Sequence, residues 1–183
     1  MQARLRKVYC PSVLLVIALA ITIGVACTQE EEAYGDAKSI SFAENLWEAM
    51  QGYQNWPLAS DVYPGTSPHG QFLRMYYNYV HVGDDAYHVI VKDNFGGEGA
   101  SIQTVSNRPE EFLMAVTVMV QRDENYNLQG PDWFYVKYQA DGTLDTNEQG
   151  VPLAGLVGKD SDTGCMPRHA KAEGGDQLLM NDA

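Results

Sequence analysis

Four short runs of aromatic and β-branched residues limit most strongly what this chain can fold into. Each run has the length of a β-strand and is bounded by turn-forming residues. The runs are Phe72–Tyr79, Val89–Val91, Phe112–Val120 and Trp133–Tyr138. Because no long helical segments alternate with them and no internal repeat is present, a doubly wound parallel sheet is disfavoured. We therefore expect an α+β domain in which an antiparallel β-sheet is flanked by helices.

Two helices are predicted, one at each end of this domain. Ser41 and Glu44 have the spacing of a capping box, and apolar residues then recur at helical intervals until about Trp56. A short last helix is predicted to carry Cys165 and His169 on one face, because residues four apart are neighbours on a helix.

The N-terminal segment has the parts of an export signal. Basic residues precede the uncharged stretch Val13–Ala26, which is shorter than the ~20 residues that a membrane-spanning helix needs. Small residues before Cys27 resemble a bacterial lipoprotein junction, and the alternative is ordinary signal cleavage that happens to expose this cysteine. We expect a signal peptide over 1–26, lipidation of Cys27, an acidic tether over 27–40 and one domain over 41–183. The protein is then exported, either periplasmic or tethered to a membrane only by its lipid.

Charge and cysteine content narrow the classes of function. The chain has 24 Asp and Glu against 12 Lys and Arg, and all 24 acidic residues follow the expected signal peptide. Such a surface repels a phosphate backbone, which argues against a nucleic-acid binder. Of the three cysteines, Cys10 belongs to the signal and Cys27 is expected to be lipidated, so Cys165 is left without a partner for an intrachain disulfide.

The segment Cys165–His169 differs by one residue from the haem-attachment pattern Cys-x-x-Cys-His. In that pattern two thiols bond the haem vinyl groups and the histidine binds the iron. Here Arg168 occupies the position of the second cysteine. The change removes one thioether and keeps the metal ligand.

Several further motifs follow one order along the chain and, with this segment, resemble the cytochrome P-460 family. The resemblance covers about residues 42–182. Its motifs are Pro68–Gly70, Arg74–Asn78, Val89–Gly96, Thr117–Arg122, Asp132–Phe134, and His169-Ala170 with Asp176. The resemblance implies an exported and often dimeric domain that holds a c-type haem and acts on a small nitrogen compound such as hydroxylamine or nitric oxide.

The resemblance also implies roles for individual residues. His169 matches the axial iron ligand, Cys165 the first thioether cysteine, and Lys92 the lysine that some members link covalently to the haem ring. An iron held from one side by His169 leaves its other face open to a small-molecule substrate. Electrons would pass to a soluble electron-transfer protein, and the acidic surface favours a basic partner.

Three outcomes remain open because of Arg168. Haem is bound with His169 and one thioether at most, or Cys165 and His169 serve a smaller metal such as copper. In the third outcome the domain binds neither and is a structural or partner-binding module. Two ligands are too few for a tight copper site, and the spacing of the possible supplements does not bring them together: His69, His81, His88 and Met166.

Asp93 and Glu98 are weak candidates for proton transfer beside such a site. A carboxyl group within hydrogen-bond reach of a substrate can act as a general acid or base. The competing interpretation is that both are solvated loop carboxylates. The sequence contains neither a Gly-x-Ser-x-Gly elbow nor a zinc signature, so hydrolysis and zinc binding are not predicted.

Overall fold

A computed structural model describes residues 34–171 of the protein, except 129 and 160. The expected signal peptide, the first half of the expected tether with Cys27, and Asp176 lie outside the described residues. In the described part of the chain, no helix combines the length and the apolar character needed to cross a membrane.

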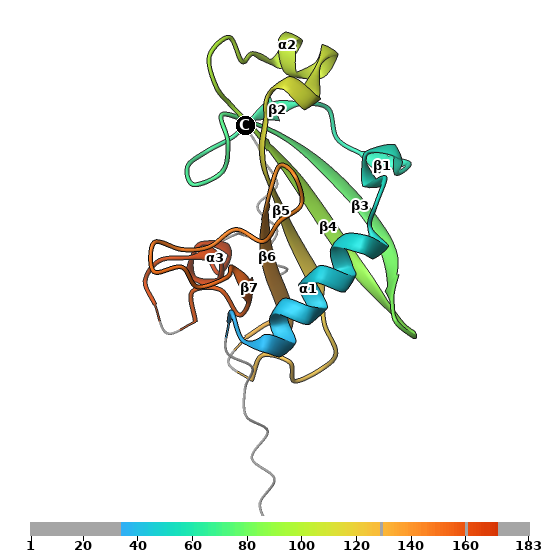
Figure 1. The fold of residues 1–183 in the computed structure, drawn as a ribbon, viewed down its shortest axis with the longest axis vertical. Coiled ribbons are helices and arrows are strands. Elements are labelled where there is room, and N and C mark those ends of the chain that lie inside the picture. Colours follow the sequence, from blue (N-terminus) through green and yellow to red (C-terminus); the bar gives the residue numbers. More distant parts are fainter. Residues whose placement is uncertain (1–33, 129, 160, 172–183) are drawn as a thin grey trace, which may run out of the picture.

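An antiparallel sheet of seven strands organises the described residues (Figure 1). The four runs that the sequence identified become its long strands: β3 (Phe72–Val82), β4 (Asp85–Phe95), β5 (Leu113–Gln121) and β6 (Trp133–Gln139). Three short strands complete it: β1 (Leu58–Ala59), β2 (Tyr63–Pro64) and β7 (Ala154–Gly155). The order is β1-β3-β4-β5-β6-β7, with β2 also paired to β3. The prediction of an α+β fold with an antiparallel sheet is confirmed.

The first helix, α1 (Ala37–Ala49), begins earlier than predicted. Asp36 caps it, and its side chain accepts hydrogen bonds from the backbone N–H groups of Lys38 and Ser39. The proposed capping box at Ser41 therefore lies inside the helix, and the last four residues of the expected tether belong to α1. A capping box does occur farther along, where Ser101 caps α2 (Ile102–Asn107).

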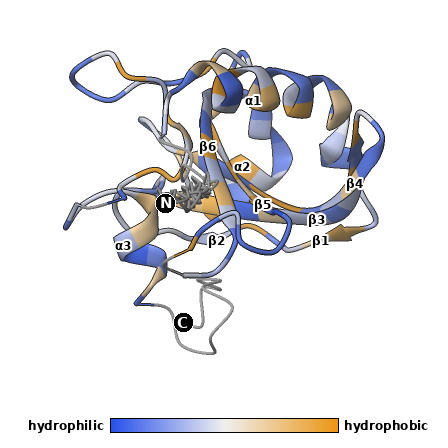
Figure 2. Ribbon diagram, turned by 90° about the horizontal axis from the view of Figure 1, so that it is seen from below, coloured by the Kyte–Doolittle hydropathy of each residue, from blue (hydrophilic) through white to orange (hydrophobic). Residues whose placement is uncertain are grey.

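Single turns and one short helix complete the fold. The chain forms 3₁₀ turns at Tyr53–Asn55 and Pro109–Glu111. The predicted last helix is present as α3 (Cys165–His169), with Gly164 at its N-cap. Figure 2 shows α1 and α3 on opposite sides of the sheet.

The main core lies between α1 and the sheet. Leu46 of α1 and Met50, the residue that caps its C-terminus, are buried against aromatic and β-branched side chains of β3 to β6. The Tyr138 hydroxyl, on β6, donates a hydrogen bond of 2.7 Å to the carbonyl of Ala43 in α1. Because side chains alternate along a strand, the residues between these core positions face away from α1.

Candidate functional site

A cavity of about 500 Å³ lies on the face of the sheet opposite α1. Its volume is within the range of about 300–1,000 Å³ that ligand pockets occupy. Alternate residues of three neighbouring strands form its floor. In strand register, Lys92 lies beside Thr117, which lies beside Lys137, and the row of Ile90, Met119 and Tyr135 is next to it.

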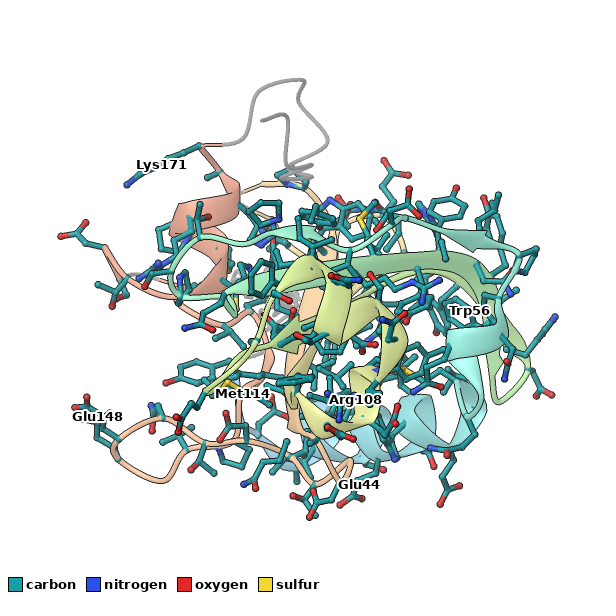
Figure 3. The ribbon with its side chains drawn as sticks, turned by 90° about the horizontal axis from the view of Figure 1, so that it is seen from above. Glu44, Trp56, Arg108, Met114, Glu148 and Lys171 are labelled. Carbon is teal, nitrogen blue, oxygen red and sulfur yellow. The ribbon has the colours of Figure 1, made fainter. Side chains whose placement is uncertain are left out.

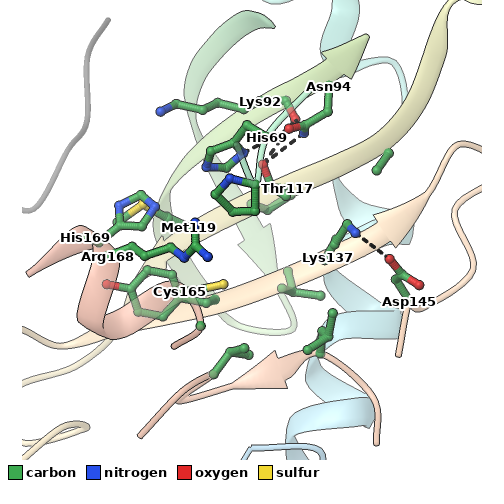
Figure 4. Close-up of a pocket in the computed structure, with 18 of the residues that line it drawn as sticks. His69, Lys92, Asn94, Thr117, Met119, Lys137, Asp145, Cys165, Arg168 and His169 are labelled. Atoms are coloured by element: carbon green, nitrogen blue, oxygen red, sulfur yellow. Dashed lines mark hydrogen bonds and ion pairs between the residues drawn. The ribbon is translucent and has the colours of Figure 1, made fainter. Parts of the chain in front are cut away.

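Two segments from distant parts of the sequence wall the cavity. One is α3 with the glycine before it, and the other is the loop of residues 66–70 between β2 and β3. Figure 4 shows Cys165, Arg168 and His169 projecting from α3 toward the side chains of the sheet. The fold therefore places Cys165–His169, the segment that resembles a haem-attachment motif, at a cavity.

His169, the last residue of α3, lines this cavity and is only 5% exposed. Its ring lies 5.4 Å from that of Tyr135 and 6.3 Å from that of His69, measured between centroids. The imidazole is thus turned into the protein and not toward water.

Cys165 also lines the cavity and is a free thiol. It packs beside the apolar cluster of Ile90, Met119 and Tyr135. Burial raises the pKa of this thiol to about 11, although the positive charges of Lys137 and Arg168 act in the opposite direction. The sulfur is therefore protonated at neutral pH in the metal-free protein, and a metal ion that bound it would have to displace this proton.

Lys92 brings a buried amine to the cavity floor. It is 7% exposed, and its desolvation lowers the pKa of the ammonium group to about 8. A substantial fraction of the side chain is then uncharged in mildly alkaline solution. Lys137, in the same row, forms an ion pair of 2.7 Å with Asp145 (Figure 4).

Arg168 connects the two walls. One of its guanidinium nitrogens donates a hydrogen bond of 3.3 Å to the backbone carbonyl of Ser67. The side chain that stands in place of the second haem-attachment cysteine therefore bridges α3 and the loop of residues 66–70. It also lines the cavity.

Asp93 and Glu98 do not line the cavity. Asp93 alternates with Lys92 and Asn94 along β4, so it faces the α1 side of the sheet. There it is 2% exposed and accepts hydrogen bonds from the hydroxyl of Tyr53 (2.5 Å) and that of Tyr76 (3.1 Å). Glu98 is exposed on the turn that follows β4. The expectation that these carboxylates lie beside a ligand in this cavity is therefore corrected. The alternation of side chains along β4 puts Asp93 on the other face of the sheet, and Glu98 lies on an exposed turn outside the cavity.

Asp93 makes a pH-dependent contribution to stability that can be measured. Burial raises the pKa of its carboxyl to about 6, against the opposing effect of its two tyrosine hydrogen bonds and of Arg74. The folded state then binds more protons than the unfolded state between about pH 4 and pH 6. The contribution of Asp93 to the free energy of unfolding therefore falls as pH rises through this interval, by on the order of 2 to 3 kcal/mol.

The variant Asp93→Asn removes this titration. In urea unfolding at pH 4 to 7, the stability of the native protein relative to Asp93→Asn is expected to decrease with rising pH. Glu98→Gln, an exposed change of the same charge, is the control. A pH-independent difference between the native protein and Asp93→Asn would show that the buried carboxyl has an ordinary pKa.

Of the four possible additional metal ligands named from the sequence, only His69 lines the cavity. It lies in the loop of residues 66–70, lines the cavity and places its ring beside that of His169. Burial lowers the pKa of His69 to about 4, so the imidazole is neutral at neutral pH. His81 and His88 lie toward the other end of β3 and β4, and Met166 packs in the apolar cluster without lining the cavity.

A bare metal ion has few protein ligands here. Across the described residues, no group of three or more His, Cys, Asp or Glu side chains is gathered as a metal site would require. Structural and catalytic sites for such ions commonly use three or four protein ligands.

Fold and site together define an α+β domain with a ligand-sized cavity on one face of an antiparallel sheet. Compared with known proteins, the chain matches no family model, no curated protein and no solved structure.

Proposed function

We propose that the cavity binds haem, with His169 as the protein ligand to iron and Cys165, the only cysteine among the described residues, as the candidate for a thioether. The single observation that carries this proposal is the inward-turned His169 on the wall of a cavity of about 500 Å³. Haem brings four nitrogen ligands of its own, so one imidazole is sufficient to hold it. A bare copper ion would need three or four ligands from the protein, and haem does not.

The lining of the cavity suits the chemistry of a porphyrin. Ile90, Met119 and Val157 provide apolar surface against which a large flat ring can be buried. Charged residues add a second match, because Lys92, Lys137 and Arg168 line the cavity together with one carboxylate, that of Asp145. This bias toward positive charge in a strongly acidic protein complements the carboxylates that haem carries.

Each residue of the motif has a defined part in this proposal. His169 would hold the iron, Cys165 would form at most one covalent link, and Arg168 would join the walls instead of attaching haem. Lys92 is the candidate for the additional link to the ring that the family resemblance implies.

The proposed activity is redox chemistry on a small nitrogen species such as hydroxylamine or nitric oxide. Bound haem supplies one-electron transfer and a site for small ligands at iron. The chain itself would exclude water with its apolar floor and would orient the ring through His169. A soluble, basic electron-transfer protein is the proposed partner, because exposed carboxylates such as Glu44 and Glu148 lie at the periphery of the molecule (Figure 3).

The proposal is tested by loading the protein with haem in cells that express a cytochrome maturation system. The native protein is expected to show a Soret absorption band and to contain bound iron in an amount equal to that of the bound haem. His169→Ala should reduce haem occupancy at least about tenfold, because the protein ligand to iron is lost.

His81→Ala, a change of an exposed histidine away from the cavity, is the matched control and should retain full occupancy. A haem-stained denaturing gel then separates covalent from noncovalent binding. A colourless native protein without iron would exclude haem binding and would leave the haem-free binding or structural module as the function of this fold.

A further inference from the structure

His69 is held in one orientation by the end of β4. Its Nδ1 lies 2.9 Å from Oδ1 of Asn94, and the backbone N–H of Gly70 donates to the same oxygen at 3.2 Å. The loop can approach β4 this closely because residue 70 is glycine. A Cβ atom there would lie 2.5 Å from the carbonyl oxygen of Phe95.

The hydrogen bonds of Asn94 determine which nitrogen of His69 carries the proton. The side-chain nitrogen of Asn94 donates to the carbonyl of Lys92 (2.8 Å) and to the hydroxyl of Thr117 (3.1 Å). The amide oxygen therefore faces His69, and an amide oxygen can only accept. Nδ1 of His69 must be the donor, so Nε2 keeps a lone pair that can bind a metal.

The spacing of the two imidazoles fits a shared metal centre. The ring centroids of His69 and His169 are 6.3 Å apart, and the ring planes are inclined by 83°. A metal in a straight line between two imidazole nitrogens separates the ring centres by roughly 6 Å, given metal–nitrogen bonds of about 2 Å. A tetrahedral angle at the metal would shorten this separation to about 5 Å. The observed centroid separation of 6.3 Å is therefore closer to the value for two ligands on opposite sides of one metal than to the tetrahedral value.

We propose that His69 and His169 form a paired-imidazole site in which the iron of the bound haem is held by both residues. The inference rests on the proposed function and extends it. Asn94 is then a positioning residue, because it fixes the tautomer that leaves Nε2 of His69 available. With haem bound, His69 would occupy the metal position that a small nitrogen compound needs, and it would have to leave that position before such a compound could bind.

The test compares the absorption and electron paramagnetic resonance spectra of haem-loaded variants. The native ferric protein is expected to be low-spin, as two imidazole ligands require. His69→Ala should keep its haem and become high-spin, and added imidazole should restore the low-spin spectrum. His69→Gln, which can keep the hydrogen bond to Asn94, serves as a second variant in case the alanine variant does not fold.

Each other outcome overturns a defined part of the argument. A native protein that binds haem but is high-spin, or a His69→Ala variant that stays low-spin, would refute the paired-imidazole site and would leave haem binding through His169 intact. A native protein with no Soret band would refute haem binding itself, and the paired site with it. His81→Ala should match the native spectrum in every case.

Discussion

Arg168→Cys is expected to convert the protein into one that retains haem after denaturation. The substitution supplies the second thiol of the attachment pattern on α3, where Cys165 and His169 already line the cavity. On a haem-stained denaturing gel, the fraction of protein that carries covalent haem should rise severalfold over that of the native chain. With thiols at positions 165 and 168 the variant can form two thioethers with haem at this motif, whereas the native motif can form only one.

Arg168→Ala is the matched control for this gain. It removes the same guanidinium and the same hydrogen bond to Ser67, but it adds no thiol. Both variants should therefore lose the link between α3 and the loop of residues 66–70, and only Arg168→Cys should gain covalent haem. Equal staining of the two variants would show that the cavity does not present a porphyrin edge to position 168.

Phe134→Ala is expected to cause a large loss of stability. Phe134 is fully buried on the α1 side of β6 and contacts Phe42 with ring centroids 4.9 Å apart. Removing a buried phenylalanine side chain typically lowers the free energy of unfolding by about 3–5 kcal/mol, because it loses burial and leaves a cavity. Urea or thermal unfolding followed by circular dichroism measures the effect.

The next residue of the same strand provides the contrast. Tyr135 lies on the opposite face of β6, on the cavity floor beside His169. Tyr135→Phe keeps the ring and is expected to change stability by less than about 1.5 kcal/mol. A similar loss in Phe134→Ala and Tyr135→Phe would show that the two faces of the sheet do not differ in their contribution to the fold.

Local sequence patterns predicted the sheet well. The four runs were rich in β-branched or aromatic residues and bounded by turns, and each became part of a strand with an antiparallel neighbour. The predicted start of α1 at Ser41 is wrong because Asp36, five residues earlier, caps the helix instead. Asp36 receives two backbone hydrogen bonds, and the helix therefore begins before Ser41.

The candidate site was only partly predictable. Cys165 and His169 are close in sequence, so a short helix was enough to place them together. His69 is 100 positions from His169, and only the pairing of β2, β3 and β4 brings its loop to α3. By contrast, the position of Asp93 could have been deduced, because strand alternation places it on the face opposite Lys92.

The placement of α1 and the cavity on opposite faces of the sheet has an evolutionary consequence. The side chains that provide most of the folding energy are not those that would hold a cofactor. Mutations on the cavity face can therefore accumulate while the scaffold stays intact. Descendants of such a domain can abandon a prosthetic group, or adopt another, without first having to invent a new way to fold.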